Sequence, residues 1–269
     1  MDVTRGDELA AISRLERLLP PPPPGETWIG DDAAVVAGGL LLAIDSVVQG
    51  VHFVGDSEGD LEAAGWRVVV RNVSDIAAMG GEPRRLMVSV AGTVDLDALY
   101  AGIIAAAEAY SCPVVGGDLT EADAVVITAA ITGSVEGPPV LRSGARPGDV
   151  IYVSGPLGGA AASGYKARPQ ARVAEGRAAR RGGATAMIDV SDGFALDLRR
   201  LAQASGVGVR LEEVPVARGA TQAEAMGGGD DYELIYTGRA DAAIGGIRVG
   251  VCTDDPTKLP DPAGWTHDL

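Results

Sequence analysis

The chain has 269 residues, a hydrophobic fraction of 46% and a formal net charge of −15. This length predicts two compact domains or one large one. Nucleic acid is excluded as a partner, because the negative charge would repel its backbone and an aromatic content of 4% leaves few side chains for base stacking. No segment approaches 18 uninterrupted apolar residues, so we expect no membrane-spanning helix and no membrane partner.

Two cysteines and two histidines are too few for a disulfide framework, a zinc site or a multi-histidine metal site. We expect Cys112 and Cys252 to be core thiols in a reducing cytoplasm. The acidic N-terminus does not resemble a signal peptide, which also favours a cytoplasmic location. An arginine-rich stretch from Arg168 to Arg181 is expected to be a solvated helix face.

The first half of the chain alternates between predicted helices and strands. Apolar residues at helical spacing predict a helix over 7–19, which the proline run at 20–24 ends. Further helices are expected over 61–79 and 96–110. After a turn that begins at Trp28, strand-like runs are expected at 33–36, 40–44, 85–91, 113–115 and 124–132. Interleaved strands and helices are typical of an α/β domain.

A domain boundary is expected near residues 136–139, where Gly and Pro follow the last of these strands. It divides the chain into residues 1–136 and 137–269. The second half is predicted to contain strands at 149–154, 207–211 and after the corner at 227–233, and a helix over 194–204 that the segment 186–193 opens. The glycine-rich segment 155–159 either cradles a phosphate or forms a tight turn.

One pattern recurs along the whole chain: an apolar strand or a small-residue corner ends in aspartate. It occurs at Asp31/Asp32, Asp45, Asp75, Asp118, Asp189/Asp192 and Asp230/Asp231. A single such corner is an ordinary turn. Glycine also allows close approach to a ligand, and aspartate is a hard oxygen donor suited to Mg²⁺. Because each Mg²⁺ takes only one or two carboxylates, six corners indicate several Mg²⁺ ions around a polyphosphate.

The standard nucleotide signatures are absent, since the chain has neither a P-loop nor the protein-kinase motifs. Metal-assisted phosphoryl transfer depends on positioning and charge neutralisation more than on an acid or base. It therefore suits a chain with almost no histidine, and we assign no residue as a general acid or base.

The order of the motifs resembles that of thiamine-monophosphate kinases, over nearly the whole chain. The motifs are Ile29-Gly30-Asp31-Asp32-Ala33-Ala34, Asp45-Ser46 with Gly50-Val51-His52-Phe53, Asn72-Val73-Ser74-Asp75, Gly116-Gly117-Asp118, Arg142-Ser143-Gly144, Ile188-Asp189-Val190-Ser191-Asp192-Gly193, Gly228-Gly229-Asp230-Asp231 and Gly264-Trp265-Thr266-His267.

The resemblance implies an α/β N-terminal domain with a mixed sheet, an α+β C-terminal domain, and a homodimer whose N-terminal sheets form a barrel. It also implies that ATP and several Mg²⁺ ions bind between the domains and that thiamine monophosphate is the acceptor. By the same resemblance, Mg²⁺ ligands are expected at Asp32, Asp45, Asp75, Asp118, Asp189 and Asp192. ATP contacts are expected at Gly117, Asp118, Arg142 and Ser191, and acceptor contacts at His52, Asp230 and Trp265.

Two departures from the family pattern affect the expected site. Ala43-Ile44 stands where the family usually has Ser-Thr before the aspartate at 45, which removes two hydroxyl oxygens. Asp230 replaces a glutamate and is one methylene shorter. These departures keep two alternatives open: a superfamily enzyme with another acceptor, and a Mg-nucleotide-binding paralogue without turnover. Selenophosphate synthetase is disfavoured because no cysteine lies near the N-terminus, and the hydrogenase-maturation ATPase because the chain does not end in cysteine.

Overall fold

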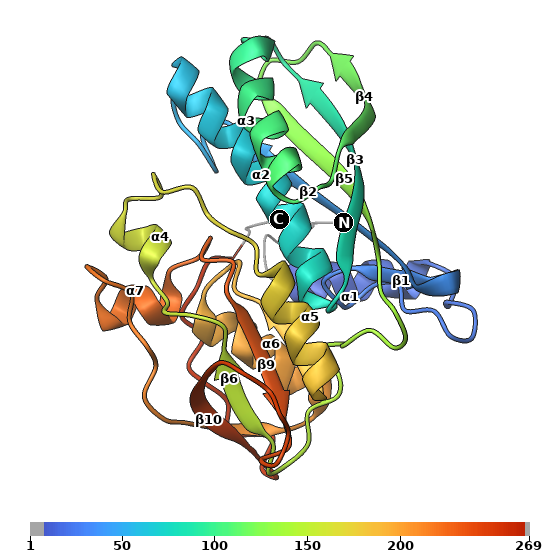
Figure 1. The fold of residues 1–269 in the computed structure, drawn as a ribbon, viewed down its shortest axis with the longest axis vertical. Coiled ribbons are helices and arrows are strands. Elements are labelled where there is room, and N and C mark those ends of the chain that lie inside the picture. Colours follow the sequence, from blue (N-terminus) through green and yellow to red (C-terminus); the bar gives the residue numbers. More distant parts are fainter. Residues whose placement is uncertain (1–7, 267–269) are drawn as a thin grey trace, which may run out of the picture.

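The computed structural model describes residues 8–266, and these form two five-stranded sheets joined through one long helix (Figure 1). The first sheet has the order β1-β2-β5-β3-β4, and only β3 and β4 run parallel. Its strands are β1 Ala34–Val36, β2 Leu40–Val48, β3 Glu82–Ala91, β4 Val114–Thr120 and β5 Val126–Ser134. The mixed sheet expected for the first half is therefore confirmed.

The second sheet is antiparallel and has the order β7-β9-β6-β10-β8. Its strands are β6 Val150–Val153, β7 Ala186–Asp189, β8 Gly208–Leu211, β9 Leu234–Gly238 and β10 Ile247–Thr253. The helices along the chain are α1 Glu8–Leu18, the 3₁₀ turn η1 Ala37–Gly39, α2 Glu58–Ala78, α3 Leu96–Ala109, α4 Gly159–Ala162, α5 Val173–Gly182, α6 Phe194–Ser205 and α7 Gln222–Gly227. The sequence analysis had not anticipated α7 or β10.

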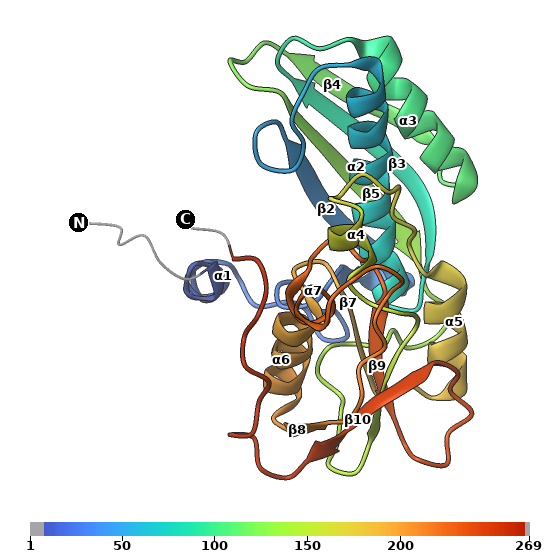
Figure 2. The same ribbon diagram turned by 90° about the vertical axis from the view of Figure 1, so that its left-hand side faces the viewer.

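Helix α2 lies between the two sheets and contacts both of them (Figure 2). Its N-terminus is capped by the Ser57 side chain, which accepts a hydrogen bond from the Asp60 N–H. Thirteen of its 21 residues are buried, far more than the single stripe of an amphipathic surface helix. It packs on β2 and β5 with α3 beside it, while its C-terminal part contacts β7 and α5. Of the helices in the described chain, none is long and apolar enough to cross a membrane.

Two strands are longer than their sequence patterns predict. We expected β2 to end at Asp45, but it continues to Val48 because it pairs residue by residue with β5. We expected Gly117 and Asp118 to form a corner, but both lie inside β4, which pairs with β3 through Thr120. In both cases, backbone hydrogen bonding to a neighbouring strand overrides the local turn preference of Gly and Asp.

The prediction of a solvated arginine-rich helix face is wrong for much of that stretch. Arg177 forms an ion pair with Glu82 on β3, and Arg180 donates to the Gly80 carbonyl oxygen at 3.1 Å. These arginines therefore bind the first half of the chain instead of facing only water. The prediction failed because periodicity does not reveal which carboxylates tertiary packing brings opposite a helix.

Helices α2 and α3 approach each other at two glycines. A Cβ atom at Gly65 would lie 2.2 Å from the Leu99 carbonyl oxygen, and one at Gly102 would lie 1.9 Å from the Glu62 carbonyl oxygen. Both distances are far below van der Waals contact with backbone atoms that cannot move independently. The α2–α3 interface therefore requires the absence of a side chain at both positions.

We expect Gly65→Ala to lower the free energy of unfolding by about 2–3 kcal/mol, because the helices must separate to admit the methyl group. Gly59→Ala, in the first turn of the same helix, is the matched control. A Cβ there has no neighbour within 4 Å, so alanine should be neutral or stabilise by up to about 1 kcal/mol. Urea denaturation of the three proteins measures both effects, and equal stability of the two variants would contradict the close-packing interpretation.

Candidate active site

Three aspartates from distant parts of the chain meet where α2 contacts the second sheet. Asp32 precedes β1, Asp75 lies in the last turn of α2, and Asp189 is the last residue of β7. Each offers a carboxylate oxygen within 4.8 Å of the others. The Ser74 hydroxyl donates to Asp189 Oδ2 at 2.6 Å and orients that carboxylate. We refer to Asp32, Asp75 and Asp189 as the acidic cluster.

Arg142 is the principal positive charge bound to the acidic cluster. Its guanidinium binds both oxygens of Asp32, with Nη2–Oδ1 at 2.8 Å and Nε–Oδ2 at 3.2 Å. The Arg142 N–H also donates to Asp31 Oδ2 at 3.0 Å. The Asp32 side chain is only 1% exposed, so its carboxylate has lost its bound water. The two-point contact with Arg142 offsets the free-energy cost of this desolvation.

One arginine does not neutralise three neighbouring carboxylates. Burial, followed by the charges of Asp45 and Asp189, raises the pKa of Asp75 well above its usual range. Burial and then the charge of Asp32 raise the pKa of Asp189 in the same direction. Closely spaced carboxyl groups that resist ionisation are typical of a site for a hard divalent cation, which removes their mutual repulsion.

The remaining predicted metal ligands are not part of the acidic cluster. Asp45 lies on β2 and pairs with Arg71, with Nε–Oδ2 at 3.2 Å. Asp192 forms an ion pair with Arg200 near the start of α6. Asp118 is exposed on β4, as is the neighbouring Gly117, and the described chain does not bring either into the cluster. Their roles toward metal and ATP stay predictions.

A cavity of about 820 Å³ contains all three predicted acceptor contacts, His52, Asp230 and Trp265. It is also lined by Arg71, which lies one helical turn before Asp75 of the acidic cluster. Ser191 and Asp192 also line it. Such a volume suits a ligand the size of a small phosphorylated molecule. The structure thus brings together residues that are more than 200 positions apart in the chain, although their individual roles stay predictions.

The backbone around the cavity holds these side chains in place. His52 Nδ1 accepts the Val48 N–H at 3.0 Å, which fixes the orientation of the ring. The Asp230 N–H donates to the Ser191 carbonyl oxygen, and the Trp265 N–H donates to that of Asp192, both at 2.8 Å. Trp265 is 55% exposed, which fits a side chain at the cavity rim. His267, which belongs to the same tail motif, lies outside the described residues.

Asp230 lies in a locally strained backbone. Its φ is 62° and that of Tyr232 is 52°, in the left-handed region that non-glycine residues rarely adopt. The buried Tyr232 hydroxyl donates to Asp230 Oδ1 at 2.7 Å. Backbone strain of this kind is concentrated at functional sites, where the surrounding structure maintains it.

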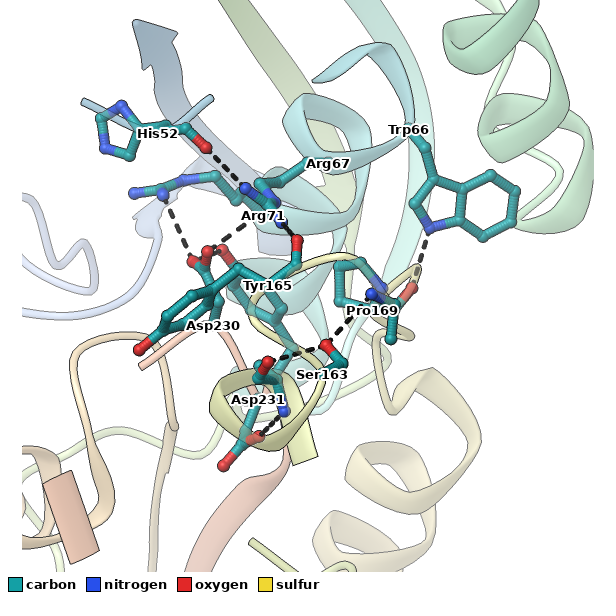
Figure 3. Close-up of polar contacts among 12 residues, drawn as sticks. His52, Trp66, Arg67, Arg71, Ser163, Tyr165, Pro169, Asp230 and Asp231 are labelled. Carbon is teal, nitrogen blue, oxygen red and sulfur yellow. Dashed lines mark hydrogen bonds and ion pairs between the residues drawn. The ribbon is translucent and has the colours of Figure 1, made fainter. Parts of the chain in front are cut away.

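Two arginines of the cavity, Arg67 and Arg71, were missed by the sequence analysis (Figure 3). Both are on α2, and both approach the carboxylate of Asp230, at 3.7 Å from Arg67 Nε and 3.6 Å from Arg71 Nη1. Two arginines four residues apart, on either side of the apolar run 68–70, were the available sequence signal. They lie on one face of that helix, where solvated charges would not be expected.

The glycine-rich segment after β6 forms a tight turn and not a phosphate cradle. Asp231 Oδ2 accepts the Gly158 N–H at 2.5 Å, and its Oδ1 accepts the Ala160 N–H at 3.0 Å. Because the Asp231 side chain already accepts from Gly158 and Ala160, these two amides are not available to a phosphate. Of the two interpretations that the sequence left open, the structure therefore supports the turn.

Comparison with known proteins places the chain among phosphoryl-transfer enzymes and their relatives. Residues 30–135 match the family described as AIR synthase related protein, N-terminal domain. The chain is 34% identical to the thiamine-monophosphate kinase of Methanopyrus kandleri, over 78% of this chain and 77% of the relative. It is 32% identical to that of Aquifex aeolicus, over 89% and 92%.

A solved structure described as "AaThiL complexed with AMPPCP and TMP" has a similar fold. It matches with a TM-score of 0.88 and 29% sequence identity, and the match covers 99% of both chains. The similarity of fold therefore extends over both sheets.

Proposed function

The chain belongs to the thiamine-monophosphate kinase family, and from this premise we propose that it transfers the γ-phosphoryl group of ATP to the phosphate of thiamine monophosphate. The products are thiamine diphosphate and ADP. The observation that carries the proposal is the adjacency of an acidic cluster to a cavity that contains His52, Asp230 and Trp265. The related structure that was solved with AMPPCP and TMP supports the same pair of substrates.

Mg²⁺ fits the acidic cluster by the chemistry of its donors. The cluster offers only carboxylate oxygens, within 4.8 Å of one another, and their charges are incompletely compensated. Hard oxygen donors in this arrangement suit Mg²⁺ better than the softer metals that prefer nitrogen or sulfur. Asp32, Asp75 and Asp189 would hold the ion, and Asp45, Asp118 and Asp192 are proposed as further ligands. When bound, Mg²⁺ supplies charge neutralisation for the polyphosphate.

The side chains of the protein act by positioning the two substrates. Arg142 presents a planar guanidinium that suits phosphate oxygens. Further contacts with ATP are proposed for Gly117, Asp118 and Ser191. His52, Asp230 and Trp265 orient the acceptor. No general base is required, because the attacking phosphate oxygen is already ionised at neutral pH. Transfer is then direct and in line, and its rate depends on alignment of the two phosphates.

The two departures from the family pattern act at different places. Ala43 lies on the same face of β2 as Asp45 and packs against the core, whereas Ile44 is 69% exposed on the opposite face. A hydroxyl at position 44 would therefore point away from Asp45. Only the loss at position 43 bears on the proposed metal site. The shorter Asp230 is compensated by the left-handed backbone that carries its carboxylate toward Arg67 and Arg71.

We further propose that residues 1–136 and 137–269 are separate domains and that the first sheet forms a barrel with that of a second copy. Supporting the dimer, Ile44 and Met87 flank Ala130 on one face of the sheet and are 69% and 55% exposed. Helices α2 and α3 lie on the opposite face (Figure 1). Adjacent exposed apolar side chains favour an interface. Sedimentation equilibrium tests it, and a monomeric mass would contradict it.

One assay separates the kinase from its alternatives. The protein is incubated with Mg-ATP and thiamine monophosphate, and thiamine diphosphate is measured by chromatography. We expect product that depends on both substrates and disappears when EDTA removes the divalent cation. ATP binding without product would favour the paralogue without turnover. ATP hydrolysis without thiamine diphosphate would favour an enzyme with another acceptor.

A further inference from the structure

One face of helix α2 carries charged residues from the acceptor cavity to the acidic cluster. Arg67, Arg71 and Asp75 are spaced four residues apart, so they lie above one another along the helix. Arg67 and Arg71 line the cavity, and Asp75 belongs to the acidic cluster. Arg71 therefore lies between a residue of the cavity, Arg67, and a residue of the acidic cluster, Asp75.

The two arginines differ in how firmly they are held. Arg67 is 8% exposed, and its Nη1 and Nη2 donate to the carbonyl oxygens of His52 and Tyr165, both at 2.6 Å (Figure 3). Its buried Nε atom has no hydrogen-bond partner within the described residues. Arg71 lies between two carboxylates, with its Nε 3.2 Å from Asp45 Oδ2 and its Nη1 3.6 Å from Asp230 Oδ1.

The two carboxylates that Arg71 contacts belong to different sites. Asp230 lies in the cavity, where the Tyr232 hydroxyl holds it independently of the arginines. Asp45 contacts Arg71 at 3.2 Å, and Arg71 lies one helical turn before Asp75 of the acidic cluster. In agreement with this placement, the charge of Asp45 contributes to raising the pKa of Asp75. A cation in the cluster attracts the Asp45 carboxylate in competition with the guanidinium of Arg71.

We propose that Arg71 couples the cation site to the acceptor site: when Asp45 turns to a bound divalent cation, the released guanidinium binds the phosphate of thiamine monophosphate beside Arg67. This inference rests on the proposed function and adds a binding residue and an order of events to it. The coupling is reciprocal, because a phosphate held by Arg71 also leaves Asp45 available to the cation.

The balance of charges around Arg67 and Arg71 explains why the cavity would bind a phosphate once Asp45 has moved away. In the structure, the two arginines are matched by the carboxylates of Asp45 and Asp230. Once Asp45 is withdrawn, two guanidinium groups face Asp230 alone, so the potential at this part of the cavity wall becomes more positive. Arg67 Nε lies 3.7 Å from Asp230 Oδ2 and makes no hydrogen bond within the described residues. This N–H and the donors of Arg71 then match the oxygens of a phosphate monoester, for which arginine is well suited.

The test is performed without metal, so that a cation bridging to the phosphate cannot contribute. We expect Asp45→Asn, which imitates withdrawal of the carboxylate, to bind thiamine monophosphate about five- to tenfold more tightly than the wild-type protein in EDTA. The probe is an NMR titration, which measures weak dissociation constants. Adding Arg71→Gln to Asp45→Asn should abolish the gain. Thiamine, which has no phosphate, should show no gain in either protein.

Arg239 and Asp241 provide the matched control, because they form a two-point ion pair whose side chains are 75% and 72% exposed. Asp241→Asn and its double variant with Arg239→Gln should leave the affinity for thiamine monophosphate unchanged. Circular dichroism checks that each variant is folded. If Arg71→Gln does not fold, Arg71→Lys replaces it and should retain only part of the gain.

Three outcomes would overturn the coupling: no gain in Asp45→Asn, a gain that persists in the double variant, or an equal gain for thiamine. Turnover of the wild-type protein is measured in parallel. Absence of thiamine diphosphate there overturns the proposed function itself, whatever the binding data show. Turnover without a gain in Asp45→Asn overturns only the role of Arg71.

Discussion

Replacing Asp75 with asparagine is expected to stabilise the metal-free protein and abolish phosphoryl transfer. In the folded chain, burial and the charges of Asp45 and Asp189 raise the pKa of Asp75. A carboxyl group that binds its proton more tightly when folded than when unfolded destabilises the fold once the pH exceeds its unfolded pKa. Asparagine has the same shape but no charge. The free energy of unfolding in EDTA should therefore rise by about 1–3 kcal/mol at pH 7.

The gain in the free energy of unfolding of Asp75→Asn should increase with pH. It should be largest above pH 7 and shrink as the pH falls toward about 4, where the carboxyl group is protonated even in the unfolded chain. Turnover should fall by about a thousandfold, since the neutral amide no longer contributes to charge neutralisation. Urea denaturation in EDTA and the kinase assay measure the two effects. A variant that loses stability at pH 7, or that keeps wild-type turnover, would contradict this role of Asp75.

Asp149→Asn is the control for Asp75→Asn. Asp149 is 4% exposed and lies away from the acidic cluster, and it accepts hydrogen bonds from the Arg146 N–H and the Thr185 hydroxyl at 2.9 and 2.7 Å. Removing its charge should weaken these bonds and lower stability by about 1 kcal/mol, with turnover retained. The two substitutions are chemically identical, so opposite stability effects would identify like-charge repulsion as the property specific to Asp75.

In contrast to Asp75→Asn, Arg142→Met should destabilise the metal-free protein. It leaves the carboxylate of Asp32, whose side chain is 1% exposed, without its two-point partner. Breaking a buried ion pair from one side typically lowers the free energy of unfolding by about 3–5 kcal/mol. Mg²⁺ should restore much of this loss, because a cation in the acidic cluster compensates the same charge. ATP should bind at least about tenfold more weakly, if Arg142 contacts its phosphates.

Thermal unfolding with and without Mg²⁺, together with nucleotide titration, measures these effects of Arg142→Met. Arg142→Lys should retain part of the stability but less of the ATP affinity, because a single ammonium group cannot make the two-point contact. Arg239→Met removes an exposed arginine and should change neither quantity. A stability loss in Arg142→Met that Mg²⁺ does not reduce would contradict a shared role of arginine and cation at Asp32.

Local sequence patterns predicted most of the regular elements, because helical spacing and apolar runs are read from neighbouring residues. The predicted helix over 61–79, for example, corresponds to α2. Elements were missed where local preference was weak: α7 has only six residues, and β10 lies in a tail rich in Gly and Pro. The capping box of Thr221 and Glu224 was a sequence feature from which α7 could have been found.

For the site, the identity and order of the motifs were enough to predict the family and both substrates. The individual aspartates were equivalent at that level, since each was an acidic corner of similar composition. The fold makes them different. Asp189 joins the acidic cluster, whereas Asp45 and Asp192 pair with arginines and Asp118 lies exposed on β4.

What the amino-acid sequence determined by itself was therefore most of the regular elements, the family and the class of reaction. Only the tertiary structure decided which carboxylates meet in the acidic cluster and that Arg67 and Arg71 line the cavity. The physical reason is distance. Helical periodicity acts over a few residues, whereas the repulsion within the acidic cluster arises only when α2 packs against β7 and brings Asp75 beside Asp189.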